Sequence, residues 1–559
     1  MMSTVREVAS RCVTCVAVLS VAIVADLSRT ALAQAPPPVE ARPGIPTDAE
    51  LEASGAVVGR IVFNLRNIFN EADPRENIAL YRLANRLHIM TREETISAQL
   101  LFRTGEVYSG RLLAETERNL RELNYLHDAS VRPFAYDGKH VDIVVETRDV
   151  WSLLPGFSYS RKGGVNEGGI ELEEQNLLGH GKDLSLSWSH EVERDSVLLQ
   201  WRDPNVMQTR WRSDLAYSMN DDGRLRFIEM ERPFYALDTR WSAGGTLFDF
   251  SRVDSRYDLG HIVDEFKRDQ SFVELRGGWS AGLVNGRVWR WLAGFHYDDN
   301  NFSNAPDKAP PVSLPPDRKL VYPWAGIAML EDRFAKSANL DKIGRTEDLD
   351  LGTSFTLQLG WASPTFGADR DALIVNGALH KGYSWTHAQT LLLNTAISGR
   401  LESGQIADGL LAGEARYYWR WRPKRVFFAG VTGAASEAID PEDQIQLGGD
   451  NGLRGYPLRY QTGTSRALFT VEQRYYSDWF PFRLFYVGGA VFADVGRTWG
   501  QGVVGAPSLG WLSDVGFGLR LGNARSGFGS VVHIDLAFPL NRTPEIDQVQ
   551  LLIETKDTF

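Results

Sequence analysis

The sequence has almost no cysteine and no long apolar run in its main part. Its two cysteines, Cys12 and Cys15, both lie near the N-terminus. Beyond them the chain offers no thiol for a disulfide bond or for a cysteine metal site. After the N-terminal segment, no stretch approaches the roughly 18 consecutive apolar residues that a membrane helix needs. Any membrane crossing must therefore be made by strands.

The N-terminal residues, 1–33, predict a secretory signal peptide. Arg6 and Arg11 precede an apolar run over residues 13–25, and a small-residue cleavage pattern ends at Ala33. The mature protein is therefore expected to be exported. The whole chain carries a formal net charge of -11. This acidic balance argues against nucleic acid as a partner.

The next part of the chain predicts a linker over 34–54 and a small α+β domain over 55–149. The linker begins with a proline-rich stretch, which is typical of stiff spacers. In the domain, a strand is expected at 57–63, a helix follows at 77–89, and a second helix begins after Ser109 as its N-cap. Asp137 and Gly138 then separate two extended runs, which predicts a β-hairpin.

From residue 150 to residue 559 the apolar period changes to two. Leu184, Leu186 and Trp188, for example, alternate with polar neighbours. The 16 tryptophans fit the aromatic girdles of a membrane barrel. A secreted β-propeller or β-sandwich is the alternative, but the last strand alternates and stops on Phe559, which favours a membrane barrel. About twenty candidate segments predict an antiparallel transmembrane barrel of 16 to 20 strands.

Several short motifs occur in a characteristic order along the chain. They are "FRTGEVY" in the α+β domain, "NLLGHGK" at 176–182, "LRGY" at 453–456, "FADVG" at 492–496 and "VGFGLRLG" at 515–522. In this order they resemble the BamA/TamA type of outer-membrane assembly barrel, the bacterial surface antigen superfamily related to the two-partner-secretion transporters. The resemblance implies a barrel of 16 strands preceded by one POTRA-like domain, and it covers essentially the whole mature chain.

The glycine-rich segment "GGDNGLRGYP" at 448–457 contains a single arginine, Arg454. Such a loop can cradle a phosphate, bind calcium, make a turn, or carry one charge to a partner. The strand alternation places Glu472 and Asp494, together with Phe492, on the inward series. The resemblance implies that the loop folds back into the lumen, where Arg454 meets these acids. The residues expected to form this internal strut are Arg454, Gly452, Gly455, Tyr456, Glu472, Phe492, Asp494 and Gly496.

No residue pattern predicts catalysis, a metal site or a cofactor. The chain has no GxxxxGK[ST] phosphate loop and no HExxH motif. His533 and Asp535 lie on one inward series, which leaves open either acid–base work or a polar lining of the lumen. The chain is therefore not expected to be an enzyme.

The first and last barrel strands are expected to meet at a lateral seam. Pro155 and Gly156 lie in the first strand, at 152–161, and Phe559 ends the last. Proline has no N–H to donate and glycine pairs weakly, so this edge is expected to be short of ladder bonds. The alternative is that Pro155 ends the linker from the α+β domain and the strand begins at residue 157.

These features predict a protein of the Gram-negative outer membrane with its N-terminal domain in the periplasm. It is expected to insert client proteins into the membrane, or translocate them across it, through backbone pairing at an exposed sheet edge. The expected partners are membrane lipid, unfolded or extended clients, and periplasmic chaperones or accessory subunits. A passive channel or surface antigen, lipid export and a barrel hydrolase are the rivals. The single POTRA-like domain favours a narrow client range.

Overall fold

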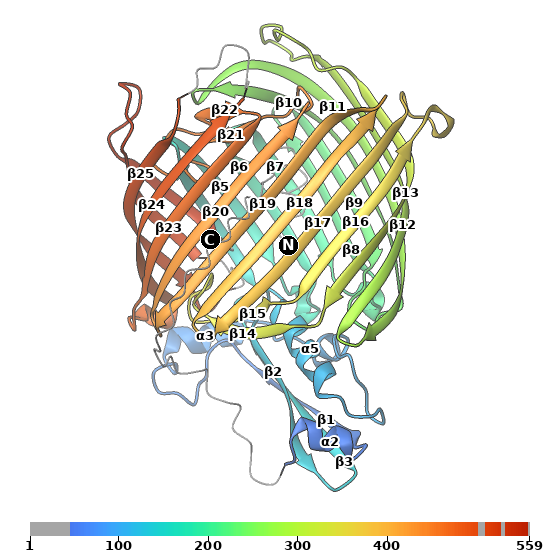
Figure 1. The fold of residues 1–559 in the computed structure, drawn as a ribbon. Helices are drawn as coiled ribbons and strands as arrows, with labels where there is room; N and C mark the ends of the chain where they lie inside the picture. The colour runs from blue at the N-terminus through green and yellow to red at the C-terminus, as the bar shows by residue number, and fades with distance from the viewer. Residues whose placement is uncertain (1–44, 501–508, 527–530, 557–559) are drawn as a thin grey trace.

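The computed structural model describes residues 45–500, 509–526 and 531–556 of the chain. They form a small α+β module and a large closed β-barrel (Figure 1). In this part of the chain, no helix is long and apolar enough to cross a membrane. The expected signal peptide at 1–33 and the terminal Phe559 lie outside the described residues.

The α+β module is a three-stranded sheet covered by short helices. Its strands have the order β1-β3-β2, with β1 parallel to β3 and β2 antiparallel to it. The elements are α2 Asp48–Ala53, β1 Val57–Arg66, α3 Ala79–Leu87, α4 Glu93–Ser97, α5 Gly110–Arg121, β2 Leu126–Tyr136 and β3 His140–Asp149. The predicted hairpin forms, with Gly138 at φ +97° in its turn. Ser109 stands at the N-cap position of α5, but its side chain makes no capping hydrogen bond.

The module begins earlier than the sequence indicated. Helix α2 lies inside the range expected to be linker, and its Leu51 is fully buried in the module core. Thr47 and Glu50 cap this helix reciprocally, side chain to backbone. The last part of the expected linker, from Thr47 onward, is therefore a folded part of the module.

The barrel closes with 20 strands, the upper end of the expected range. They are β4 Leu153–Lys162, β5 Val165–Glu174, β6 Asp183–His190, β7 Asp195–Asp203, β8 Arg212–Asn220, β9 Gly223–Arg232, β10 Trp241–Asp258, β11 His261–Val284, β12 Arg287–Asn304, β13 Arg318–Glu331, β16 Thr353–Ala362, β17 Ala372–Thr386, β18 Gln389–Glu402, β19 Gln405–Arg422, β20 Arg425–Glu437, β23 Ser465–Tyr476, β24 Phe485–Trp499, β25 Leu512–Asn523, β26 Val531–Pro539 and β27 Gln550–Lys556. Short 3-10 turns lie at Leu177–Gly179, Val206–Gln208, Pro364–Phe366 and Pro481–Arg483.

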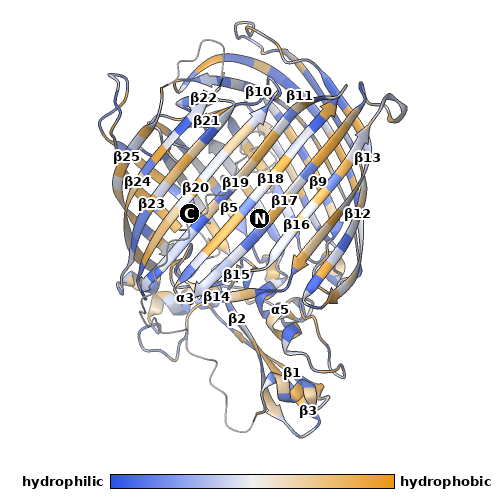
Figure 2. Ribbon diagram, in the orientation of Figure 1, coloured by the Kyte–Doolittle hydropathy of each residue, from blue (hydrophilic) through white to orange (hydrophobic). Residues whose placement is uncertain are grey.

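The barrel wall alternates between apolar side chains facing out and polar side chains facing in. Leu184, Leu186 and Trp188 on β6 are exposed on the outer face, as predicted from their spacing. Hydrophobic and hydrophilic positions alternate along the strands around the wall (Figure 2). An exposed apolar band on a closed antiparallel barrel is the surface that lipid covers. The mainly β, membrane-spanning fold class is therefore confirmed.

Two connections between barrel strands have secondary structure of their own and lie at opposite ends of the barrel. The β13–β16 connection forms the hairpin β14 Phe334–Ala338 and β15 Thr346–Asp350, close to the module (Figure 1). The β20–β23 connection forms the pair β21 Ile445–Leu447 and β22 Gln461–Gly463, at the end away from the module. We call these the floor hairpin and the lumen loop, residues 332–351 and 438–464.

Candidate functional site: the lumen loop, the floor hairpin and the seam

The lumen loop holds its glycine-rich turn by its own backbone. Gly449 N–H donates to the Pro457 carbonyl at 2.9 Å, and Leu453 N–H donates to the Gly448 carbonyl at 3.0 Å. The Asn451 side chain accepts from Gly448 N–H at 2.6 Å. These bonds fix the turn before it meets the wall, so the following arginine projects in a defined direction.

Two positions of the turn require glycine, because a Cβ atom there would clash with the barrel wall. Gly452 has φ +120°, and a Cβ there would lie 2.1 Å from a methyl group of buried Leu468. A Cβ on Gly455 would lie 2.7 Å from the Cβ of Asp514 and 3.0 Å from the Pro539 nitrogen. The loop therefore approaches the wall so closely that side chains at residues 452 and 455 are excluded.

The Arg454 guanidinium is buried against three carboxylates on the inner wall. Nε and Nη2 donate to the two oxygens of Asp494 at 2.7 and 3.1 Å, a bidentate contact. Nη1 donates to Glu472 at 3.2 Å and to Asp535 at 3.3 Å. The guanidinium carbon lies 3.3 Å from the centre of the Phe492 ring. The structure thus brings the loop arginine together with both acids that alternation placed inward.

The other expected strut residues surround this contact. Tyr456 is fully buried, and its hydroxyl donates to the Ser513 carbonyl at 2.9 Å. A Cβ on Gly496 would lie 2.7 Å from a methyl group of Leu447, so this glycine lets β21 approach the wall. Together they pack the base of the loop against β24 and β25.

Further charged groups, whose partners the sequence patterns did not indicate, complete the cluster. Arg520 on β25 contacts both Asp535 and Glu472, and Arg474 Nε donates to Glu472 at 3.2 Å. Asp514 accepts from Gly455 N–H at 3.0 Å. Asp535, for which the sequence leaves open a polar lining or acid–base work with His533, is a partner of Arg454. Arg520 lies in the late motif "VGFGLRLG", which was a signal for its importance but not for its partner.

A second set of ion pairs fixes the beginning of the lumen loop to another part of the wall. Arg400 on β18 makes a bidentate contact with Asp440 at 2.9 and 2.8 Å. Arg318 on β13 contacts Asp440 at 2.9 Å and Glu442 at 2.7 Å. The loop is therefore anchored at β13 and β18 as well as at β23–β26, and it spans part of the lumen.

The floor hairpin reaches the same charge cluster from the module end. The Leu340 carbonyl accepts from Arg474 Nη1 at 2.6 Å, and Asp341 accepts from the Tyr418 hydroxyl at 2.8 Å. Ile343 packs beside Gly522, where a Cβ would lie only 3.0 Å away. The tip of the hairpin thus contacts β19, β23 and β25 inside the barrel.

The opposite side of the floor hairpin contacts the module. Arg121 of α5 donates to both oxygens of Asp348, at 2.8 and 2.7 Å. Glu117 of α5 pairs with Lys336 of β14. Burial works to raise the pKa of Glu117, but the hydrogen bonds from Lys336 and from the Val131 backbone outweigh it, so the pKa is lowered. A chain of polar contacts therefore connects the module, the hairpin and the strut.

The seam between β27 and β4 is the least paired strand boundary of the described barrel. Ile553 opposite Arg161 is its one registered pair among the described residues. By contrast, β26 and β27 register without a break over the whole length of β27. Lys162 and Glu554 approach to 3.9 Å across the seam. On the module side of this pair, no further residues of β4 and β27 are registered with each other in the part of the chain that the structure describes.

Pro155 and Gly156 lie within the first barrel strand. Strand β4 begins at Leu153, and Pro155 registers with Leu172 of β5. The alternative in which the strand begins only at residue 157 is therefore wrong. Both residues lie on the module side of Arg161, where the residues that would stand opposite them in the last strand are outside the described part of the chain.

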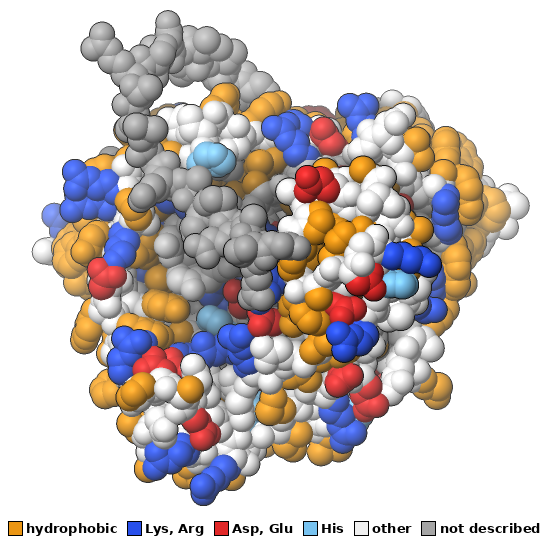
Figure 3. All heavy atoms as spheres, turned by 90° about the horizontal axis from the view of Figure 1, so that it is seen from below, with side chains coloured by type: hydrophobic (Ala, Val, Ile, Leu, Met, Phe, Trp, Pro, Cys, Tyr) orange, Lys and Arg blue, Asp and Glu red, His pale blue; other side chains and the backbone are white. Residues whose placement is uncertain are grey.

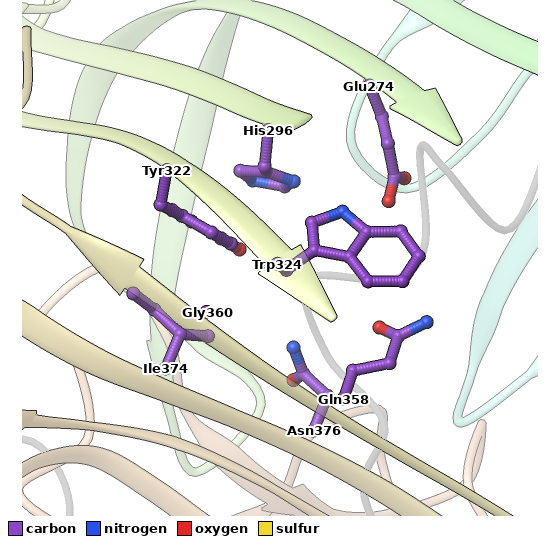
Figure 4. Close-up of a pocket in the computed structure, with 8 residues that line it drawn as sticks. All are labelled: Glu274, His296, Tyr322, Trp324, Gln358, Gly360, Ile374 and Asn376. Atoms are coloured by element: carbon purple, nitrogen blue, oxygen red, sulfur yellow. The ribbon is translucent and has the colours of Figure 1, made fainter. Parts of the chain in front are cut away.

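A separate small cavity of about 140 Å³ is cut into the wall over β11 to β17 (Figure 4). The His296 ring stacks on the Tyr322 ring at 4.5 Å, and Glu274 and Trp324 lie beside them. Its residues come from neither the loop nor the seam. Across the described ranges, no group of three or more His, Cys, Asp or Glu side chains is placed to hold a metal ion.

Comparison with known proteins gives distant structural likenesses alone. No family model matches the chain, and no curated protein matches it. BamA from Haemophilus ducreyi lacking POTRA domains 1-3 is 12% identical with a TM-score of 0.37, covering 88% of this chain and 84% of that one. CdiB from Acinetobacter baumannii is 11% identical with a TM-score of 0.44, covering 89% and 74%. CdiB from Escherichia coli is 13% identical with a TM-score of 0.44, covering 89% and 76%.

The first of these names also occurs in the family that the sequence motifs resemble. All three TM-scores lie below 0.5. The fold of this chain accordingly rests on its own strand order and register, and these likenesses assign it no activity.

Proposed function

We propose that the protein is an outer-membrane barrel that handles extended client polypeptides, with its module in the periplasm. The observation that carries the proposal is the seam, where a single residue pair is registered among the described residues of the two strand edges. Backbone groups that stay unpaired in lipid cost several kcal/mol each. A client strand that supplies the missing bonds is therefore favoured at this edge, and its recognition depends on backbone rather than on sequence.

The interior of the barrel supports a route at the seam rather than through the lumen. The lumen loop is held by buried ion pairs to β13, β18 and β23–β26, and the floor hairpin contacts both the wall and the module. A passive channel has no need of two such obstructions. In this proposal Arg454 is a strut that holds the loop against the wall, and the module receives clients at the hairpin end.

Site-specific photo-cross-linking in living cells tests the proposal. A photoreactive amino acid at Tyr159 stands on the exposed face of β4 beside the seam, and the same group at Leu199 on β7 is the matched control, because both side chains are exposed on the outer face. Polypeptide adducts are expected from Tyr159 and not from Leu199, as read by mass spectrometry. Equal adducts at both sites would contradict the seam route. Lipid adducts alone at Tyr159 would favour lipid export instead.

Deletion of the module distinguishes a client-handling barrel from a passive pore. Because α2 packs into the module core, the deletion should span 47–149 and keep the first 46 residues. The truncated barrel is expected to insert and to lose the Tyr159 adducts. If the adducts persist unchanged, the module has no part in client handling.

A further inference from the structure

Helix α3 of the module carries an exposed apolar stripe. Leu80, Leu83 and Leu87 follow one another at helical spacing, and Leu80 and Leu87 are 64% and 65% exposed. Ile78 and Ile89, just outside the two ends of the helix, are exposed as well. Large apolar side chains exposed together in water are unfavourable, and such patches mark interaction sites.

The helix is held in place by a different side. Tyr81 is buried, stacks on Phe69 at 4.2 Å, and donates its hydroxyl to the carbonyl of Phe482 in the β23–β24 turn. Asn85 is also buried, and its amide donates to the Phe69 carbonyl at 2.9 Å. The leucine stripe takes no part in these contacts. It is therefore free for another surface, while the helix stays fixed to the barrel rim.

The turn that α3 contacts exposes apolar side chains next to the outer face of the barrel. Tyr475 ends the outward series of β23 and Phe485 begins that of β24, and both are exposed. Between them, the turn that α3 contacts exposes Trp479 at 66% and Phe482 at 76%. Viewed from the module end, hydrophobic side chains lie along the outer edge of the molecule and in patches beside basic ones (Figure 3). Exposed apolar side chains thus reach the turn on which α3 is fixed.

The charge of the helix suits a phospholipid headgroup layer. Its polar side carries Arg82 and Arg86, and the helix contains no acidic residue. Aromatic side chains at the rim and basic side chains on the polar face of an amphipathic helix are features of elements that lie in a membrane interface. A periplasmic protein would also cover apolar surface, but it would not explain why the turn that holds the helix exposes Trp479 and Phe482 at the barrel rim.

We propose that α3 is an interfacial helix that inserts its leucine stripe into the membrane leaflet at the module end of the barrel. Lipid is its partner, and the contact holds the module against the membrane beside β23 and β24. The proposal goes beyond the handling of clients and does not depend on it, because it requires only that the barrel spans the membrane.

Depth-dependent fluorescence quenching tests this contact in the full chain. Because Cys12 and Cys15 are the chain's two cysteines and lie in the expected signal peptide, the mature protein can carry one introduced thiol without competition. Leu83→Cys is labelled with a small environment-sensitive dye and placed in phosphatidylethanolamine–phosphatidylglycerol vesicles containing shallow doxyl lipids. The control Val107→Cys is on the module, where Val107 is 68% exposed and pairs with Val57, and Val491→Cys on β24 serves as the lipid-facing reference.

The dye at Leu83 is expected to be quenched at least half as strongly as the dye at Val491, while the dye at Val107 is not quenched. Leu87→Cys should repeat the result and guards against a local folding defect. Quenching at Leu83 that equals that at Val107 would overturn the proposal. Shielding of Leu83 from iodide in cell envelopes, without lipid quenching in vesicles, would overturn it in favour of a protein partner.

Discussion

The strut wall and the seam are near neighbours in the barrel and differ sharply in how they are held. In the wall, β23 to β26 register without interruption, and Arg454, Arg474 and Arg520 meet buried acids on its inner face. At the seam, only the pair Arg161 and Ile553 is registered in the described structure. A set of buried ion pairs thus lies beside the strand boundary with the fewest registered pairs among the described residues.

The lumen loop contacts both regions. Arg454 fastens it to the wall, and its other side lies against the β4–β5 turn, where a Cβ on Gly163 would come within 2.1 Å of the Leu458 nitrogen. Because the lumen loop is fixed to the wall of β23 to β26, it can support the β4–β5 hairpin, which borders the seam. We therefore expect the wall, β23 to β26, to keep its shape while the edge of β4 at the seam moves.

Arg454→Ala is expected to have the largest effect on the wall. It leaves three buried carboxylates without their shared cation, which costs on the order of 3–5 kcal/mol, and less where lumen water reaches them. The barrel should still insert, but the temperature at which the unboiled, fast-migrating form is lost should fall. Arg459→Ala is the control, because Arg459 lies in the same loop and its side chain is partly exposed. Equal shifts for the two variants would contradict the strut.

Gly452→Ala should weaken the same region by a smaller amount. The substitution places a side chain at φ +120° and against buried Leu468, and backbone strain of this kind costs about 1–3 kcal/mol. Gly404→Ala is the matched control, because Gly404 also has a positive φ, of +82°, but no atom lies within 4 Å of a Cβ there. The difference between the two variants in heat stability measures the close approach to Leu468 together with the larger φ, and no difference would mean that the loop tolerates a side chain at residue 452.

Asp348→Asn should loosen the floor hairpin from the module with a moderate effect. The substitution removes the charge that Arg121 contacts with two hydrogen bonds, and charged hydrogen bonds contribute about 1.5–3 kcal/mol. Single-channel recordings in planar bilayers should show larger or more frequent openings. Asp478→Asn, at a fully solvated site in a turn at the same end, should leave the recordings unchanged. Unchanged conductance in Asp348→Asn would show that the hairpin does not depend on the module.

The acid sensitivity of the module contact should be the smallest effect. Since the pKa of Glu117 is lowered in the folded protein, its stabilisation is present above the ordinary glutamate value of about 4.3. It is lost as the pH falls through the lowered folded value. Limited proteolysis of the module should therefore speed up at pH 4 relative to pH 7. Glu117→Gln should be cleaved faster than the unchanged protein at pH 7, and its cleavage rates at pH 4 and pH 7 should differ less. If the two rates of this variant differ as much as those of the unchanged protein, Glu117 is not the group responsible.

The alternation of apolar and polar residues, together with the order of the sequence motifs, predicted that Arg454 lies near Glu472 and Asp494. Period two put Glu472 and Asp494 on the inner face, and the Gly-rich segment around Arg454 indicated the loop that meets them. Alternation specifies the face of a strand but not its neighbour at a given height, because that depends on the stagger of the closed barrel. For this reason Asp535 and Arg520 could not be assigned as partners.

Two folded elements were missed for different reasons. Helix α2 had a readable signal, the capping pair Thr47 and Glu50, but the prolines before it suggested a linker. The floor hairpin had no readable signal, because its mixed charges resemble those of an exposed turn. Asp348 and Lys336 find their partners on the module, which is distant in sequence, so only the tertiary arrangement gives these charges a role.

The most direct test of the account is to lock the seam. The register places Arg161 opposite Ile553, so Arg161→Cys with Ile553→Cys should form a disulfide between β4 and β27. Leu519→Cys with Ile534→Cys locks the registered pair of β25 and β26 and serves as the control. Oxidation of the seam pair should abolish client adducts at Tyr159, and reduction should restore them, while the control pair has no effect. Full adduct yield in protein verified to be cross-linked at the seam would contradict the account.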